Sequence, residues 1–432
     1  MVPKLRLVQL QTQLERFPDS CAEMALLEHA DLSGCKALTR LPDSIGHLQQ
    51  LVHLDLTACT SLQALPDTLT QLQALRHFSC NRCSSLEGLP SGFEQLQLLQ
   101  YLDLRECESL TALPESLGQL SALQHLNLSG CISLHALPDS LGQLSALQQL
   151  DLSDCSSLNA LPDDLGQLSV LRHLDMSGCI SLSAMSGTIQ LLTILGLQVS
   201  SDSASDDSDD DLSGFYFDPE CEHPPPWQHI LRAMFANQQS HNWKLIAVPE
   251  SLGQLSALLR LDLKSCGMLT NLLDSLGQLT ALQDLVLTQC FSLIFLPASL
   301  GDLSALLMLD LEWCTMLRDL PESLGQLAAL QELNLSSCFS LDALPPSLGD
   351  LSALQALNLS KCRSLTALPP SLGQLSALQS LDLGYCESLA ALPDSLEQLP
   401  SLKYLDLDGC YGLAAVPDSL RQLPRNKGMR RV

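Results

Sequence analysis

The sequence predicts an α/β solenoid, in which short coils of one repeated unit stack side by side. Three observations support this prediction. Cysteines recur every 24 residues from Cys35 to Cys179, and again from Cys266 to Cys410. Apolar residues make up 46% of the 432 residues but aromatic residues only 4%, so leucine has to build most of the core. A fixed period overrides the two or three globular domains that this length alone would suggest.

One unit reads LQHLNLSGCISLHALPDSLGQLSA. The alternation around Leu126 and Leu128 predicts a short strand. The following PDSLGQL predicts a short helical or 3₁₀ segment, with Asp139 or Ser140 able to cap its start. Gly142 inside this segment lowers helix propensity, so a long helix is not expected.

A single unit leaves both flanks of its leucine row in water. Stacking the units covers those flanks and pairs their strands into a parallel sheet. The repeat therefore predicts a solenoid in which each coil contacts only its neighbours.

The pattern LxxLxLxxCxxLxxLPxSLGxL resembles the leucine-rich repeat. With Cys where many such repeats have Asn, it resembles the repeats of plant intracellular disease-resistance receptors of the TIR/NB type, and it is also similar to Ras-group leucine-rich repeat scaffolds. The resemblance implies a right-handed, horseshoe-shaped solenoid with a concave parallel β-sheet, short helical or 3₁₀ convex segments, and a protein ligand on the concave surface. Such receptors also carry a nucleotide-binding module, but this chain has no GxxxxGK[ST] motif.

The array is interrupted once, where the acidic run SDSASDDSDDD breaks the register. This composition predicts disorder. It is interpreted either as a tolerated loop or as a regulatory segment that an acidophilic kinase could phosphorylate. The predicted organisation is an N-terminal lead-in (1–13), a first repeat block (14–199), an acidic and largely disordered insertion (200–243), a second repeat block (244–423) and a basic tail (424–432).

The net charge of −26, from 22 basic and 48 acidic residues, argues against nucleic acid or an anionic membrane as the main partner. No apolar run is long enough to span a membrane, and the start lacks the features of a signal peptide. We therefore expect a cytoplasmic protein. No HExxH, GxSxG or glycine-rich phosphate loop occurs. We expect no enzyme activity, no catalytic residues, no cofactor and no metal, and the oligomeric state stays open.

The 24-residue cysteine ladder is interpreted as a set of reduced, buried thiols that act as small hydrophobic side chains. Cys80 and Cys83 form a CNRC pair. Because Cys80 takes a leucine position and Cys83 belongs to the ladder, a buried pair is favoured over a metal or redox site.

Two columns are expected to face away from the core along the strands. Four residues before each ladder cysteine, the column is mostly Asp or Asn. It predicts either a negative groove for a basic ligand or local bonds to the backbone. The second column lies six residues before each ladder cysteine, and in the first block it contains five histidines: His29, His53, His77, His125 and His173. They predict a pH-sensitive or metal-binding stripe. The alternative is that they only reflect copying of the repeat unit.

The second block lacks these histidines and carries aromatic residues instead. Exposed aromatic residues are frequent hot spots of protein interfaces. The alternative is that they cover a leucine edge. The candidate partner-binding residues are Phe291, Trp313, Phe339, Tyr385 and Tyr411 beside the ladder, and Tyr404 on a strand.

These features favour a non-catalytic protein–protein recognition scaffold, which the resemblance assigns to plant-type defence or intracellular signalling. One alternative is a regulatory scaffold or adaptor for a GTPase, a phosphatase or a ubiquitin ligase. The other is a structural or cryptic product of repeat expansion with no dedicated ligand.

Overall fold

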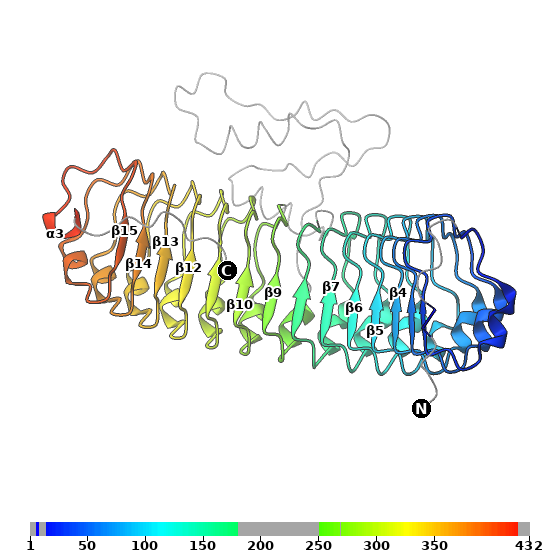
Figure 1. The fold of residues 1–432 in the computed structure, drawn as a ribbon. Coiled ribbons are helices and arrows are strands. Elements are labelled where there is room, and N and C mark those ends of the chain that lie inside the picture. The colour runs from blue at the N-terminus through cyan, green and yellow to red at the C-terminus, as the bar shows by residue number, and fades with distance from the viewer. Residues whose placement is uncertain (1–5, 8–13, 180–249, 268, 422–432) are drawn as a thin grey trace, which may run out of the picture.

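The computed structural model describes residues 6–7, 14–179, 250–267 and 269–421. They form one fifteen-stranded parallel sheet in which each strand pairs with the next along the chain. Figure 1 shows the strands side by side along one face, with the short helical segments behind them. The strands are β1 (Arg6–Leu7), β2 (His29–Asp31), β3 (His53–Asp55), β4 (His77–Ser79), β5 (Tyr101–Asp103), β6 (His125–Asn127), β7 (Gln149–Asp151), β8 (His173–Asp175), β9 (Arg260–Asp262), β10 (Asp284–Val286), β11 (Met308–Asp310), β12 (Glu332–Asn334), β13 (Ala356–Asn358), β14 (Ser380–Asp382) and β15 (Tyr404–Asp406).

The opposite side of the coils is formed by short 3₁₀ segments, as the sequence predicted. Each segment packs against those of the neighbouring coils. They are η1 (Asp19–Glu23), η2 (Asp43–His47), η3 (Asp67–Gln71), η4 (Phe93–Gln95), η5 (Glu115–Gln119), η6 (Asp139–Gln143), η7 (Asp163–Gln167), η8 (Glu250–Gln254), η9 (Asp274–Gln278), η10 (Ala298–Asp302), η11 (Glu322–Gln326), η12 (Pro346–Asp350), η13 (Pro370–Gln374) and η14 (Asp394–Gln398), and the described chain ends in α3 (Asp418–Arg421).

The start of η6 corrects one detail of the sequence analysis. Its N-cap is Pro138, whose extended backbone leads into the segment, and no side chain caps it. The predicted cap by Asp139 or Ser140 is therefore wrong. The Ser140 hydroxyl instead donates a hydrogen bond to the backbone carbonyl of Glu115 in the preceding coil. The Ser140 side chain thus bonds to a neighbouring coil and does not cap its own 3₁₀ segment.

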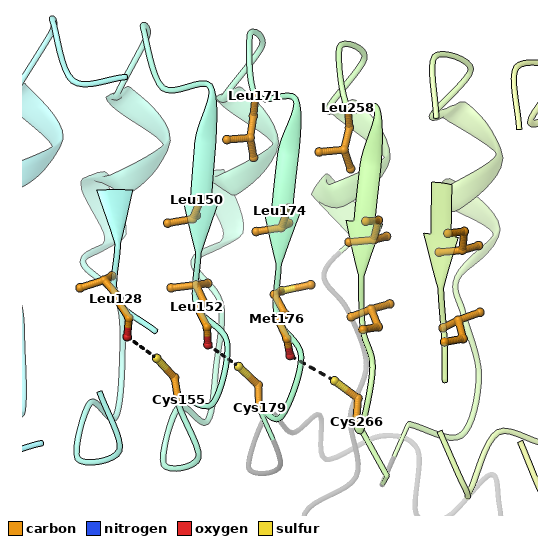
Figure 2. Close-up of a cluster of buried hydrophobic side chains, with 14 of the residues drawn as sticks. Leu128, Leu150, Leu152, Cys155, Leu171, Leu174, Met176, Cys179, Leu258 and Cys266 are labelled. Carbon is orange, nitrogen blue, oxygen red and sulfur yellow. Dashed lines mark hydrogen bonds between the residues drawn. The ribbon is translucent and has the colours of Figure 1, made fainter. Parts of the chain in front are cut away.

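The core is a continuous stack of leucines, one set from each coil. Leu126, Leu150 and Leu174 are the buried middle residues of three successive strands and are at most 1% exposed. Figure 2 shows such equivalent leucines following one another from strand to strand. Each fully buried leucine stabilises the fold by roughly 1.5–3 kcal/mol. Stacking therefore supplies the stability that one isolated coil lacks.

The cysteine ladder does more than fill space. Thirteen of its thiols donate a hydrogen bond to a backbone carbonyl oxygen of the preceding coil, that of the residue directly after the strand, over 2.9–3.4 Å. Figure 2 shows three of them, from Cys155 to Leu128, from Cys179 to Leu152 and from Cys266 to Met176. The ladder thus connects neighbouring coils. Cys80 and Cys83 are both fully buried, as predicted.

Burial favours the protonated form of ladder thiols such as Cys155 and Cys362. It raises the pKa of Cys155 and of Cys362 to about 12, mainly by desolvation of the thiolate. A protonated thiol can donate to a carbonyl, whereas a thiolate cannot. The sequence predicts only an apolar role for these residues, and their role as donors becomes visible in the structure.

A sharp turn precedes every ladder cysteine. The residue before it has a positive φ in all fourteen coils that carry a ladder cysteine. Glycine fills this position at Gly34, Gly130, Gly178 and Gly409, but ten side-chain-bearing residues also adopt it. A left-handed conformation costs a non-glycine residue roughly 1–2 kcal/mol.

Replacing Ala58 with glycine should therefore stabilise the protein by about 1 kcal/mol, since Ala58 has a φ of 60°. Denaturant unfolding of both proteins measures this difference. Ala64→Gly in the same coil is the control, because Ala64 has no positive φ and glycine should destabilise it. Equal changes in the free energy of unfolding for Ala58→Gly and Ala64→Gly would show that the positive φ of Ala58 does not destabilise the protein.

The two predicted repeat blocks belong to one continuous sheet. β8 pairs directly with β9, with Leu174 opposite Leu261. Cys266 follows Cys179 by 87 residues instead of 24, so this one coil contains 63 additional residues (87 − 24). β8 and η8 both belong to this coil, and η8 packs between η7 and η9. The predicted insertion (200–243) and basic tail (424–432) lie outside the described residues.

Candidate functional site

The sheet face carries the two predicted columns of side chains. In most strands the middle residue is buried and the first and third residues are more exposed, as in β6 and β8. The first residues of the strands form one column and the third residues another. Because consecutive strands pair in register, equivalent residues lie next to one another across the sheet.

The histidine column is a row of neighbouring rings. The ring centroids of His29 and His53 are 5.8 Å apart, and those of His53 and His77 are 5.7 Å apart. Tyr101 continues the row to His125, with centroid distances of 6.1 and 5.9 Å. Burial, followed by the nearby His53 and Arg76, lowers the pKa of His77. His77 therefore resists taking up a proton.

The metal-binding interpretation of this column finds no support in the geometry. Within the described residues, no group of three or more His, Cys, Asp or Glu side chains could hold a metal ion. His125 instead shares a hydrogen bond with the side-chain amide oxygen of Gln149 at 2.9 Å. His173 begins β8, and Arg260 is its register partner on β9.

The acidic column bonds locally to the backbone. Its Asp and Asn side chains accept a hydrogen bond from the N–H two residues later, as between Asp31 and Ser33 at 3.0 Å and between Asp175 and Ser177 at 2.9 Å. The same bond recurs in most coils. These residues therefore end the strands, which explains why Asp and Asn interchange there.

A hollow lies on the sheet face over β5 to β9. Its volume is about 280 Å³. It is lined by both columns and by the leucines between them: Tyr101, His125, Leu126, Asn127, Gln149, Leu150, Asp151, His173, Leu174, Asp175, Arg260 and Asp262. The hollow crosses the junction between the two repeat blocks. It brings the predicted His125 and His173 together with Arg260, which sequence reasoning did not single out.

The aromatic candidates of the second block lie mainly on one rim of the solenoid. Five of them flank the ladder cysteines in the turns that follow the strands, and we call these five the aromatic rim: Phe291, Trp313, Phe339, Tyr385 and Tyr411. Only Tyr404 lies on a strand, at the start of β15. Because this position is on the sheet face, Tyr404 is separate from the aromatic rim.

Two members of the aromatic rim are in direct contact. The rings of Trp313 and Phe339 meet edge to face, with centroids 5.4 Å apart. Lys361 places its Nζ 6.0 Å from the centre of the Trp313 ring, and the Arg363 guanidinium lies 5.4 Å from the centre of the Phe339 ring. The two rings were candidates from the sequence, but the two cations were not. Both cations come from the coil that follows the coil of Phe339.

Other members of the aromatic rim are open to solvent. Phe291 is 44% exposed, Tyr385 is 48% exposed and Tyr411 is 81% exposed. Trp313 and Phe339 are half-buried. A side chain that only covered a leucine edge would be largely buried, so the exposure of Phe291, Tyr385 and Tyr411 does not fit that alternative for these three residues.

The repeats are matched by models of known repeat families. A model described as a leucine-rich repeat region matches residues 82–200, and two leucine-rich repeat models match residues 329–351 and 352–411. The chain is a leucine-rich repeat protein. No curated protein matches the sequence.

Solved leucine-rich repeat structures resemble the chain over much of its length. The leucine-rich repeat protein LIC12759 of Leptospira interrogans is 27% identical over 96% of this chain and 97% of its own, with a TM-score of 0.47. The leucine-rich repeat domain of the type III effector XCV3220 (XopL) is 29% identical over 42% of this chain and 69% of its own, with a TM-score of 0.34.

The complex of TLR13 with ssRNA13 supports the fold. It is 20% identical over 90% of this chain, with a TM-score of 0.50, and this leucine-rich repeat chain spans 52% of the TLR13 chain. The narrower resemblance to plant disease-resistance receptors is not supported by these matches and stays a prediction. No helix in the described part of the chain has both the length and the hydrophobicity that a membrane span requires.

Proposed function

We propose that this leucine-rich repeat protein is a non-catalytic scaffold that recognises a protein partner, and that the aromatic rim is a main part of the recognition surface. The observation that carries the proposal is the cluster of Trp313, Phe339, Lys361 and Arg363 on three successive coils. Trp, Tyr and Arg are the residues most enriched at interface hot spots. In a chain with only 4% aromatic residues, this concentration is unusual.

The geometry suits binding because the aromatic side chains are already held in place. The edge-to-face contact restrains Trp313 and Phe339, and the neighbouring cations of Lys361 and Arg363 restrain the two rings further. A restrained side chain loses little conformational entropy when a partner binds. Arg363 is itself held by Glu387 at 3.3 Å. The cluster therefore supports a preorganised anchor with exposed Phe291 beside it.

The sheet face provides a second part of the surface in this proposal. His29, His53, His77, His125 and His173 follow it through the first block, and Tyr404 lies on it at the far end. A role in plant-type defence or intracellular signalling, in the cytoplasm, is the narrower form of the proposal. It rests on the resemblance of the repeat sequence alone.

An affinity pulldown from an extract of the source cells tests the proposal. The bait variant has Phe291, Trp313 and Phe339 changed together to Ala. We expect it to lose a partner that the unchanged protein captures, because interface anchors of this type contribute about 2 kcal/mol or more each. Circular dichroism verifies that the variant is folded.

The matched control is Phe295→Ala. Phe295 is 40% exposed but does not belong to the aromatic rim, so its loss should leave the partner bound. An identical set of captured proteins in all three baits would contradict the role of the aromatic rim. Capture of no protein by the unchanged bait would instead favour a repeat product without a ligand.

A further inference from the structure

Two arginines show how this sheet face binds a guanidinium. Arg105 pairs with Asp103, its Nη2 lying 2.8 Å from Oδ2 and its Nε 3.0 Å from Oδ1. Arg260 lies 3.1 Å from Asp262 and 3.7 Å from Asp284. Each guanidinium therefore sits against the acidic column. Arg260 lines the hollow, whereas Arg105 follows β5, the strand whose Tyr101 lines it.

Between these two arginines the acidic column continues without a cation. Asp151 accepts hydrogen bonds from the Asn127 amide at 3.0 Å and from Ser153, and Asp175 accepts one from Ser177. Within the residues that the structure describes, neither carboxylate is in an ion pair. Asp175 lies between Asp151 and Asp262 in the register of β7, β8 and β9.

The walls of the hollow suit a flat cation. Tyr101, His125 and His173 contribute aromatic rings, and Gln149 contributes an amide. A guanidinium is planar, stacks on aromatic faces and pairs with carboxylates in a bidentate manner. At about 280 Å³ the hollow is smaller than small-molecule sites, which typically have roughly 300–1,000 Å³. Its volume therefore leaves room for one long side chain.

We propose that the hollow receives an arginine side chain of the protein partner, whose guanidinium pairs with Asp175 and Asp151. This inference rests on the proposed recognition function and specifies the chemistry of the partner, a basic segment with an arginine. The partner's guanidinium sits against the acidic column in the same way as the guanidinium groups of Arg105 and Arg260 do.

The electrostatics of Asp175 agree with this assignment. Burial raises its pKa, and the neighbouring Asp262 and Asp151 raise it further, although Ser177 acts in the opposite direction. A cation beside Asp175 would relieve the repulsion among the three carboxylates. Arg260 cannot fill this role because Asp262 and Asp284 already hold it.

Titration with short peptides tests the proposal. The probe is acetyl-Gly-Arg-Gly-amide, and the controls contain lysine or the neutral isostere citrulline in place of arginine. Binding is followed by NMR of the histidine rings, since His125 and His173 line the hollow. We expect saturable shifts of these two residues with the arginine peptide, and weaker binding of both controls.

Asp175→Asn should weaken binding of the arginine peptide about tenfold, because a charge-assisted pair is lost. Asn already occupies this column at Asn127, Asn334 and Asn358 with the same backbone bond, so the fold should tolerate the change. Asp55→Asn is the matched control. It has the same bond and the same change of net charge but lies outside the hollow.

Three results would overturn the proposal. The first is an equal loss of binding in Asp55→Asn and Asp175→Asn, which would indicate only attraction to the net charge of −26. The second is equal affinity for the lysine or the citrulline peptide. The third is an Asp175→Asn variant that binds the arginine peptide as well as the unchanged protein does. If the aromatic-rim variant still loses its partner in that third case, the recognition function stands and only the arginine site fails.

Discussion

Raising the pH from 8 to 10.5 is expected to unfold the solenoid in a steep transition. The cause is the cysteine ladder, because those of its thiols whose pKa is raised by burial resist ionisation as long as the protein is folded. Their ordinary pKa is 9.0, and burial raises it to about 12 in five of them, by desolvation in every case: Cys59, Cys131, Cys155, Cys266 and Cys362. Burial raises the pKa of further ladder thiols as well, among them Cys107 and Cys338.

The sign follows from the number of protons each state binds. Below pH 9 the thiols are protonated in both states, so the free energy of unfolding does not depend on them. Between pH 9 and 12 the unfolded chain releases protons that the folded chain retains, which lowers the free energy of unfolding by about 1.4 kcal/mol per thiol and pH unit. At pH 10.5 five thiols together remove roughly 10 kcal/mol, comparable to the entire stability of a typical domain.

Tryptophan fluorescence and circular dichroism at increasing pH, in the presence of a reductant, measure this transition. Substituting one ladder thiol, as in Cys155→Ala, should reduce the number of protons released on unfolding by one. The free energy of unfolding should therefore fall less steeply with pH. It should also lower stability at pH 7, because a buried donor and its packing are lost. A free energy of unfolding that stays constant up to pH 10.5 would contradict the assignment of the ladder as buried, protonated thiols.

A methyl group added at Gly142 should destabilise the protein by about 3 kcal/mol, at the upper end of the range for overpacking. Gly142 lies in η6, where its Cβ would meet Asp164 of the next coil, 2.7 Å from the Oδ2 atom and closer still to the backbone carbonyl oxygen. A backbone group cannot move aside by changing rotamer. Gly118 and Gly166 face the following coil in the same way.

Gly88→Ala is the control for Gly142→Ala. A Cβ at Gly88 would have no heavy atom within 4 Å, and its φ is not positive. This substitution should therefore be neutral or slightly stabilising. Denaturant unfolding compares the stability of the two variants directly. A similar stability of both would show that close contact between coils does not explain why glycine occupies position 142.

The elements of the fold were predictable because each coil repeats the same local pattern. Alternation around Leu126 gave the strand, and the spacing of the leucines after the proline gave the 3₁₀ segment. What the sequence could not reveal depends on contacts between coils. Gly142 was interpreted as a weak helix former, but its role is set by Asp164, which belongs to the next unit.

The positive-φ position was missed for a different reason. Ala58, Glu106, Trp313 and Lys361 share no side-chain property, so no residue pattern marks the position. The backbone geometry comes from the turn between the strand-ending Asp or Asn and the buried cysteine. The thiol hydrogen bonds could not be predicted from the sequence either, because the acceptor is a backbone carbonyl of another coil.

The candidate surface was predictable in composition but not in arrangement. The sequence predicted the histidine column along the strands and five of the aromatic residues beside the ladder, and the structure places them there. It could not place His173 beside Arg260, because 87 residues separate these two positions along the chain. It also could not show that Lys361 and Arg363 lie against the rings of Trp313 and Phe339.

Hydrogen exchange of the protein with and without its captured partner tests the central claim most directly. If the chain is a recognition scaffold as proposed, the partner should slow exchange in the turns around Trp313 and Phe339 and in the strands β5 to β9. The 3₁₀ segments on the opposite side, such as η6 and η11, should be unaffected. Slower exchange confined to those 3₁₀ segments, with none on the sheet face or the aromatic rim, would contradict the account.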